Sequence, residues 1–250
     1  MSHKPTKSPS AGRIAPPLPQ GWRATARESL LQLLYPRWCP ACHTLLPPNA
    51  PPLCLTCQGT LGRYHEHTVG ALDRLRGAQP MPRRVLAPYL YARDDAMALV
   101  VHDIKYHGNK PLARYMGRLM GTLLPLEQEQ IDYIIPVPLT PARALERGYN
   151  QATLLAEGIS SVTGIPYLAH ALRRTRFQGS QTHRDRTHRL EAMLGSFTLG
   201  SEAIPPDSHI LLLDDVLTTG ATLTAALNAL VDIPLAQVSV GVLAVGTPTA

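Results

Sequence analysis

At 250 residues the chain is long enough for one large domain, or for a medium-sized domain with a small appendage, and 44% of its residues are apolar. It has no run of the about eighteen apolar residues that a membrane span needs, and its first residues lack the apolar core of a secretory signal, so we expect a cytoplasmic protein. Most of its 24 basic residues are arginines, and the net charge of +6 favours phosphate-bearing partners. A solvated basic surface would give the same composition.

The first part of the chain is expected to lack a fold of its own. Residues 1–22 are rich in Pro, Ser and basic residues without periodicity, which predicts a disordered arm. Apolar residues in 23–34 are spaced for one face of a short helix, which Pro36 ends. This helix leads into the segment that holds all the cysteines, so we expect a small unit of helix and cysteine segment over residues 23–70.

The cysteines form two Cys-x-x-Cys pairs, with eleven residues between Cys42 and Cys54. This spacing lets four thiolates converge on one zinc ion, as in a zinc ribbon, with the ligands Cys39, Cys42, Cys54 and Cys57. Four protein ligands leave no open position for water, so we expect the zinc to be structural. Two disulfides or a redox pair are the alternatives, and reducing conditions in the cytoplasm disfavour both.

The rest of the chain is predicted to alternate strands and helices. Residues 85–91 are predicted to form a strand, followed by two amphipathic helices over 96–106 and 112–124. Three short apolar runs are typical of strands buried on both faces of a parallel sheet, namely 133–137, 209–213 and 238–245. Helices predicted over 152–163 and 221–231 separate these runs. The alternation indicates an α/β domain over residues 83–250.

Two adjacent carboxylates stand out in the segment HILLLDDVLTTGATLTAAL, residues 209–227. Asp214 and Asp215 follow the apolar run and precede a hydroxyl-rich turn and a helix. Ligands of open α/β sheets bind at the carboxyl ends of the strands. Carboxylates there can accept hydrogen bonds from vicinal ribose hydroxyls, while the turn's backbone N–H groups receive a phosphate. An acidic strand end followed by an ordinary turn is the alternative.

The sequence DDVLTTGAT resembles the 5-phosphoribosyl-1-pyrophosphate (PRPP) signature of type I phosphoribosyltransferases. The resemblance implies a phosphoribosyltransferase-like parallel sheet flanked by helices, with magnesium bound together with PRPP. It also implies that Asp214 and Asp215 hold the ribose hydroxyls, and that the 5′-phosphate is bound by Thr218, Thr219, Gly220, Ala221 and Thr222. The sequence contains neither a GxxxxGK[ST] loop nor a GxGxxG fingerprint, so nucleoside triphosphate and dinucleotide sites are not supported.

A second block, PVPLTPARALERGYNQ, follows the predicted strand 133–137, where the fold carries its pyrophosphate loop, which makes Arg143 and Arg147 candidate pyrophosphate ligands. Together with IKYHGNKPLARYMG (residues 104–117) and the cysteine pairs, this block resembles the ComF family. These competence-associated proteins join a zinc ribbon to a phosphoribosyltransferase-like domain. Alternatively, Arg147, Gly148 and Asn150 only build a turn and cap the next helix.

Residues 173–194 are polar, rich in Arg and His, and too long for an ordinary connection, which indicates a functional loop. The part QTHRDRTHRLEAMLGSF resembles the ComF loop QTGLSRAERRRNLRGAF, although the asparagine near its end is missing. Loops in the wider fold close over the pyrophosphate, so the candidate catalytic residues are Arg184, Arg186 and Arg189. A solvated basic loop is the alternative.

Two functions stay open. In one, the chain is a PRPP-binding, ComF-like protein of natural transformation and DNA uptake that contacts single-stranded DNA and the uptake machinery. Ribbon side chains would then supply phosphate contacts and aromatic platforms, namely Arg37, Trp38, Arg63 and Tyr64, although Trp38 can equally pack the ribbon against the helix. In the other, the chain is an active phosphoribosyltransferase with an unidentified acceptor, for which the sequence shows no recognisable acceptor site.

Overall fold

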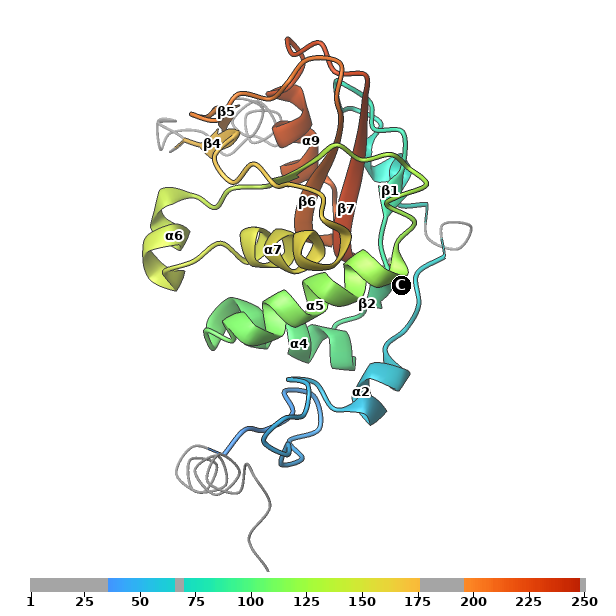
Figure 1. Ribbon diagram of the computed structural model, residues 1–250, viewed down its shortest axis with the longest axis vertical. Helices are drawn as coiled ribbons and strands as arrows, with labels where there is room; N and C mark the ends of the chain where they lie inside the picture. The colour runs from blue at the N-terminus through green and yellow to red at the C-terminus, as the bar shows by residue number, and fades with distance from the viewer. Residues whose placement is uncertain (1–35, 66–69, 176–195, 248–250) are drawn as a thin grey trace, which may run out of the picture.

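A five-stranded sheet lies at the centre of the computed structural model, which describes residues 36–65, 70–175 and 196–247. Its order is β1 (Val85–Leu86), β7 (Gln237–Gly246), β6 (His209–Leu217) and β3 (Tyr133–Pro136), with β2 (Tyr89–Tyr91) also pairing with β7. All of these pairings are parallel (Figure 1). The expected fold class, an α/β protein with a parallel sheet and an N-terminal four-cysteine cluster, is confirmed.

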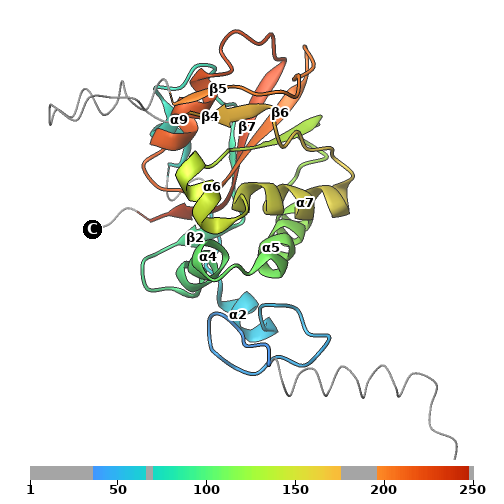
Figure 2. The same ribbon diagram turned by 90° about the vertical axis from the view of Figure 1, so that its left-hand side faces the viewer.

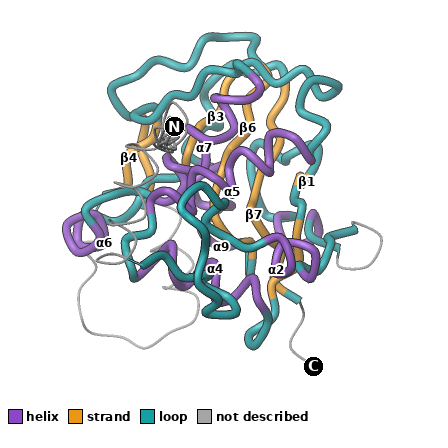
Figure 3. Tube along the Cα trace, turned by 60° about the horizontal axis from the view of Figure 1, so that its bottom comes forward, coloured by secondary structure: helices purple, strands orange, loops and turns teal. Residues whose placement is uncertain are grey.

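Helices cover both faces of this sheet. One face packs against α4 (Ala96–Tyr106), α5 (Lys110–Leu123) and α7 (Gln151–Thr163), and the other against α9 (Ala221–Asn228) and the 3-10 helix η1 (Leu72–Leu75) (Figure 2). In Figure 3 the orange strands run between purple helices. Along β6, Leu211 and Leu213 belong to the core beneath α4, α5 and α7, whereas Ile210 and Leu212 belong to the opposite core. Burial on both faces explains the continuous apolar runs.

Most predicted elements are confirmed with small shifts at their ends, and two differ in a way that matters for the site. The predicted strand 85–91 is divided into β1 and β2, with Pro88 between them, which has no N–H group to donate to a neighbouring strand. The strand predicted to end at Leu213 continues to Leu217, because its pairing with β7 extends to Val245. The acidic pair therefore lies within a paired strand rather than after it.

Several short elements were not predicted. They are α2 (Leu55–Thr60), η1, α6 (Pro141–Arg147) and the antiparallel pair β4 (Leu172–Arg174) and β5 (Phe197–Leu199). Residues 173 and 174, predicted to begin the long loop, are in β4. The predicted arm 1–22 and the helix 23–34 lie outside the described residues, and the domain boundaries stay predictions. Within the described ranges, no helix is long and apolar enough to cross a membrane.

Helices α5 and α7 approach each other closely through two glycines. A Cβ atom on Gly117 would overlap the carbonyl oxygen of Leu155, and one on Gly158 would overlap that of Arg114. The Nε atom of Arg114 also donates to Glu157 Oε2 at 2.6 Å, which joins the two helices at the surface. This packing fixes the position of α7, whose first residue reaches the pocket described below.

The cysteine segment shares a core with the helices of the first face. Leu46, Leu53 and Leu61 belong to the same buried cluster as Met97 of α4 and Met116 of α5. The hydroxyl of Tyr115 in α5 donates to Gln58 Oε1 of α2 at 2.8 Å. We therefore expect the stability of α4 and α5 to depend on the folding of the cysteine segment.

Candidate functional site: an acidic pair in a cationic pocket

A cavity of about 250 Å³ opens at the carboxyl edge of the sheet. It brings together the acidic pair, arginines of α6 and β4, a lysine of α4, and the turn after β6. Its lining residues are Tyr91, Lys105, Val137, Pro138, Leu139, Arg143, Arg147, Gln151, Arg174, Asp214, Asp215, Val216, Thr218 and Thr222. The position agrees with the general rule that parallel α/β sheets bind ligands at the carboxyl ends of their strands.

The two carboxylates of β6 have different surroundings. Asp215 is 6% exposed, and its Oδ2 atom accepts a hydrogen bond from Gln151 Nε2 at 2.9 Å and lies 3.0 Å from Lys105 Nζ. Asp214 is half-buried, lines the cavity, and accepts a hydrogen bond from the backbone N–H of Asp215 at 2.8 Å. Protein groups therefore occupy one oxygen of Asp215, which leaves Asp214 as the more available acceptor of the pair.

Burial in the pocket raises the pKa of Asp214 to about 7, and the negative charge of Asp215 adds to this shift. The backbone N–H of Asp215 and the positive charges of Lys105 and Arg174 oppose it. Since this pKa lies above its value of about 4 in an unfolded chain, the folded protein keeps a proton that the unfolded chain releases. The contribution of Asp214 to the free energy of unfolding therefore falls as the pH rises from about 4 to about 7.

Four cations surround these two carboxylates in the pocket lining, namely Lys105, Arg143, Arg147 and Arg174. Arg147 donates to Gln151 Oε1 at 3.0 Å, but its Nε atom is buried and has no hydrogen-bond partner within the part of the chain that the structure describes. The Nε atom of Arg174 is in the same situation, and burial lowers the pKa of this residue. Both arginines line the cavity, where their guanidinium groups can pair with an anionic ligand.

The turn after β6 forms a second, smaller depression of about 30 Å³, which is lined by Asp214 and residues 216–223. Arg74 of η1 lies against this turn. Its guanidinium group donates to the carbonyl oxygens of Leu217, Thr218 and Gly246 at 3.3, 2.7 and 2.7 Å. The carbonyl oxygen of Arg74 also lies against Gly220, which has a φ of 83°. Arg74 therefore holds the turn from both its side chain and its backbone.

Replacing Gly220 with alanine is expected to displace this turn. A Cβ atom there would overlap the Arg74 carbonyl oxygen, and the left-handed backbone alone costs about 1–3 kcal/mol for a residue other than glycine. Urea unfolding of Gly220→Ala should show a loss of at least about 1 kcal/mol. Gly148→Ala is the matched control, because Gly148 also has a positive φ but no atom within 4 Å of the added Cβ. An equal loss in both variants would contradict a role for the Arg74 contact.

The four cysteines come together as predicted, with their Sγ atoms all within 4.8 Å of one another. The Sγ atoms of Cys42 and Cys54 are 3.7 Å apart. Four sulfurs bound tetrahedrally at about 2.3 Å from a zinc ion would be separated by about 3.8 Å. The arrangement therefore fits a metal ion such as zinc.

The backbone around these cysteines also suits a metal. The amide of Cys57 donates to Cys54 Sγ at 3.4 Å, and a hydrogen bond between Cys42 and Thr44, 3.2 Å long, lowers the pKa of Cys42 to about 6. Burial instead raises the pKa of Cys57. Metal ligands are thiolates, so a bound cation would supply the positive charge that the buried Cys57 sulfur otherwise lacks.

The structure brings most of the predicted pocket residues together. Arg143, Arg147, the acidic pair and the threonine turn lie around connected depressions, whereas Arg184, Arg186 and Arg189 fall outside the described residues. Four residues of the site were not predicted, namely Lys105, Gln151, Arg174 and Arg74. The first two lie in segments that resemble the ComF family, but they were not identified as site residues. No spacing in the sequence signals Arg174 or Arg74, because each reaches the site from a short element that was not predicted.

Of the four ribbon side chains expected to contact DNA, several have other roles or are buried. Arg37 donates to the carbonyl oxygens of Pro48 and Ala50, at 2.8 and 3.1 Å, and so supports the ribbon itself. Tyr64 is buried, and Arg63 lies 5.2 Å from the ring centre of Tyr89. Trp38 remains, with 54% of its surface exposed, so of this set it is the side chain that can present an aromatic face.

Comparison with known proteins identifies relatives. No family model matches the chain. It is 28% identical over 178 residues to Competence protein F of Haemophilus influenzae. The aligned residues cover 69% of this chain and 75% of that protein. It is 30% identical over 135 residues to DNA utilization protein YhgH of Salmonella typhi and 28% identical over 146 residues to Competence protein ComFC of Bacillus subtilis. The chain spans 57% of the length of each of these two. Together with the α/β fold and the clustered cysteines, these relatives support the assignment of the chain to the ComF family.

Proposed function

We propose that the chain binds PRPP or a related ribose 5-phosphate in the pocket at the carboxyl edge of the sheet, and acts in competence and DNA uptake. In this proposal Asp214, with Asp215 behind it, holds the ribose hydroxyls, and residues 218–222 surround the 5′-phosphate. Arg143 and Arg147 meet the pyrophosphate. Magnesium would accompany the ligand, since a partly exposed carboxylate such as Asp214 offers the oxygen that this cation prefers.

The observation that carries the proposal is the balance of charge around the cavity. Four cations face two carboxylates there, and two arginine Nε atoms are buried without partners among the described residues. Cations outnumber carboxylates in this lining, so the pocket is suited to a ligand with several negative charges. The two carboxylates distinguish it from a plain anion site, because they can accept hydrogen bonds from hydroxyl groups on the same ligand.

The test is isothermal titration of the chain with PRPP and magnesium, alongside the variant Asp214→Asn. Because the pKa of Asp214 is about 7 and its ionised form is the better acceptor, the affinity for PRPP should increase as the pH rises through about 7 and then level off. The variant should bind weakly and without this pH dependence, which separates Asp214 from the ligand's own phosphates. Equal affinity of both proteins for PRPP would refute the proposal.

A role in DNA uptake is supported by the names of the relatives, two of which are competence proteins and one a DNA utilization protein. We propose that the chain contacts single-stranded DNA, with the exposed Trp38 of the ribbon as one contact. The ribbon would hold one structural zinc ion through its four cysteines. Binding of a labelled oligonucleotide, measured over a range of salt concentrations, tests this part separately from PRPP binding.

The pKa of Asp214 favours a second candidate function, an active phosphoribosyltransferase. A carboxylate with a pKa of about 7 is suited to act as a general base at neutral pH. In such a reaction an acceptor nitrogen or oxygen forms a bond to C1 of the ribose, the bond from C1 to pyrophosphate breaks, and Asp214 takes the acceptor's proton. Release of pyrophosphate in the presence of candidate nucleobases, and its loss in Asp214→Asn, would distinguish this enzyme from a binding protein.

A further inference from the structure

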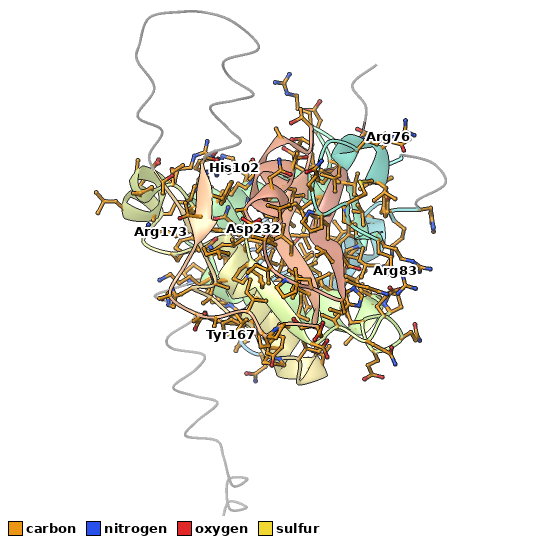
Figure 4. The ribbon with its side chains drawn as sticks, turned by 90° about the horizontal axis from the view of Figure 1, so that it is seen from above. Arg76, Arg83, His102, Tyr167, Arg173 and Asp232 are labelled. Atoms are coloured by element: carbon orange, nitrogen blue, oxygen red, sulfur yellow. The ribbon has the colours of Figure 1, made fainter. Side chains whose placement is uncertain are left out.

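An exposed surface of aromatic and cationic side chains lies beside the mouth of the pocket. We call it the α4 rim, and it consists of His102, Tyr106, His107, Lys110 and Arg147. Tyr106 is 60% exposed, although it directly follows Lys105, which lines the pocket. Figure 2 shows the end of α4 below α6, and Figure 4 labels His102. The proposed binding of PRPP uses only Arg147 of these residues, so it leaves the aromatic side chains without a function.

The rings of the rim are already arranged in contact with one another and with cations. The ring centre of His102 lies 4.9 Å from that of Tyr106 and 5.0 Å from that of His107. The guanidinium carbon of Arg147 lies 5.2 Å from the Tyr106 ring centre. On the other side of the Gly148 turn, Lys110 Nζ lies 5.3 Å from the ring centre of Tyr149, whose hydroxyl donates to the carbonyl oxygen of Ile104. These contacts reduce the rotational freedom that the rim would lose on binding a ligand.

Aromatic faces interleaved with cations are the arrangement that binds single-stranded nucleic acid. Bases stack on the rings, and the phosphates on either side of a base meet the cations. The Tyr106 ring is exposed, so a free base held by one stack on it would bind no tighter than the millimolar range. A strand adds phosphate contacts to each stack, and for this reason a polymer fits the rim better than a free nucleobase.

We propose that the α4 rim is a binding site for single-stranded DNA, in which Tyr106 stacks on a base and Lys110 and Arg147 contact the adjoining phosphates. This proposal rests on the DNA-contacting part of the proposed function and assigns it to residues of α4, α5 and α6 rather than to the ribbon itself. Arg147 belongs both to the rim and to the lining of the pocket. The strand would therefore run past the mouth of the ribose phosphate site.

The test compares three substitutions in binding of a fluorescent oligodeoxythymidine at fixed salt. Tyr106→Leu removes the aromatic face and should weaken binding about 5- to 150-fold, the effect of losing one stacked base. Tyr106→Phe keeps the face and should bind like the unmodified protein. Trp38→Leu removes the exposed ring of the ribbon and serves as the matched comparison. Since the side chains of Tyr106 and Trp38 are both more than half exposed, all three variants should retain the unfolding temperature of the unmodified protein.

Each outcome either supports or overturns the rim as a binding site. A loss in Tyr106→Leu but not in Tyr106→Phe supports the rim, whether or not Trp38→Leu also weakens binding. A loss in Trp38→Leu alone, with Tyr106→Leu unchanged, overturns the proposal and leaves DNA binding at the ribbon. No binding of the oligonucleotide by the unmodified protein also overturns it. PRPP titration of the unmodified protein and of Trp38→Leu tests the ribose phosphate site separately, because Trp38 is not among the residues that line the pocket.

Discussion

Serine in place of Cys57 is expected to abolish tight binding of zinc and to unfold the segment that contains α2. Cys57 is 8% exposed, and its sulfur belongs to a set of four that lie within 4.8 Å of one another. Zinc bound by four thiolates contributes about 10–16 kcal/mol to the folding of small metal sites, and a hydroxyl replaces a thiolate poorly. Zinc content measured with a chromogenic chelator should fall from one equivalent per chain to a small fraction.

The effect should extend beyond the cysteine segment, because this segment shares a core with α4 and α5. We expect Cys57→Ser, or removal of zinc by a chelator, to lower the unfolding temperature of the whole chain. Leu55→Ser is the matched control, since Leu55 lies in the same helix but is 76% exposed. Retention of one equivalent of zinc at unchanged affinity by Cys57→Ser would rule out the four-thiolate site.

Alanine in place of Asp215 is expected to destabilise the protein by about 3 kcal/mol, because removal of one partner leaves a buried charge uncompensated. The side chain of Lys105 is only 23% exposed and would lose its carboxylate partner, while Gln151, at 4% exposed, would lose the acceptor of its side-chain N–H group. Binding of PRPP should be lost as well. Unfolding in urea, followed by circular dichroism, measures the first effect.

A second substitution identifies the cause of this loss. If the unpaired Lys105 is responsible, then Asp215→Ala combined with Lys105→Met should recover part of the stability, because the two residues interact directly. Additive losses in the double variant would indicate that Asp215 acts through other contacts. The ion pair of Asp215 also makes Asp214→Asn the better test of ligand binding, since Asp214 has no ion pair among those found in the described residues.

The candidate pocket was predictable in part because its motifs are local. The acidic pair, the threonine turn and the arginines of α6 each occupy a few consecutive positions, and parallel strands bring their carboxyl ends to one edge. Lys105 and Arg174 were not predicted, because they reach the pocket from α4 and β4, far away in the sequence. The difference between Asp214 and Asp215 also depends on these distant partners.

The sequence by itself determined the elements whose signals are local. Continuous apolar runs identified β6 and β7, since strands buried on both faces need no polar alternation, and the paired Cys-x-x-Cys spacing identified the cluster of four cysteines. Only the tertiary structure decided which surface Tyr106 occupies, which carboxylate is already paired, and that Arg74 holds the turn after β6. These features depend on contacts between residues far apart in the chain, and such contacts leave no spacing pattern in a single sequence.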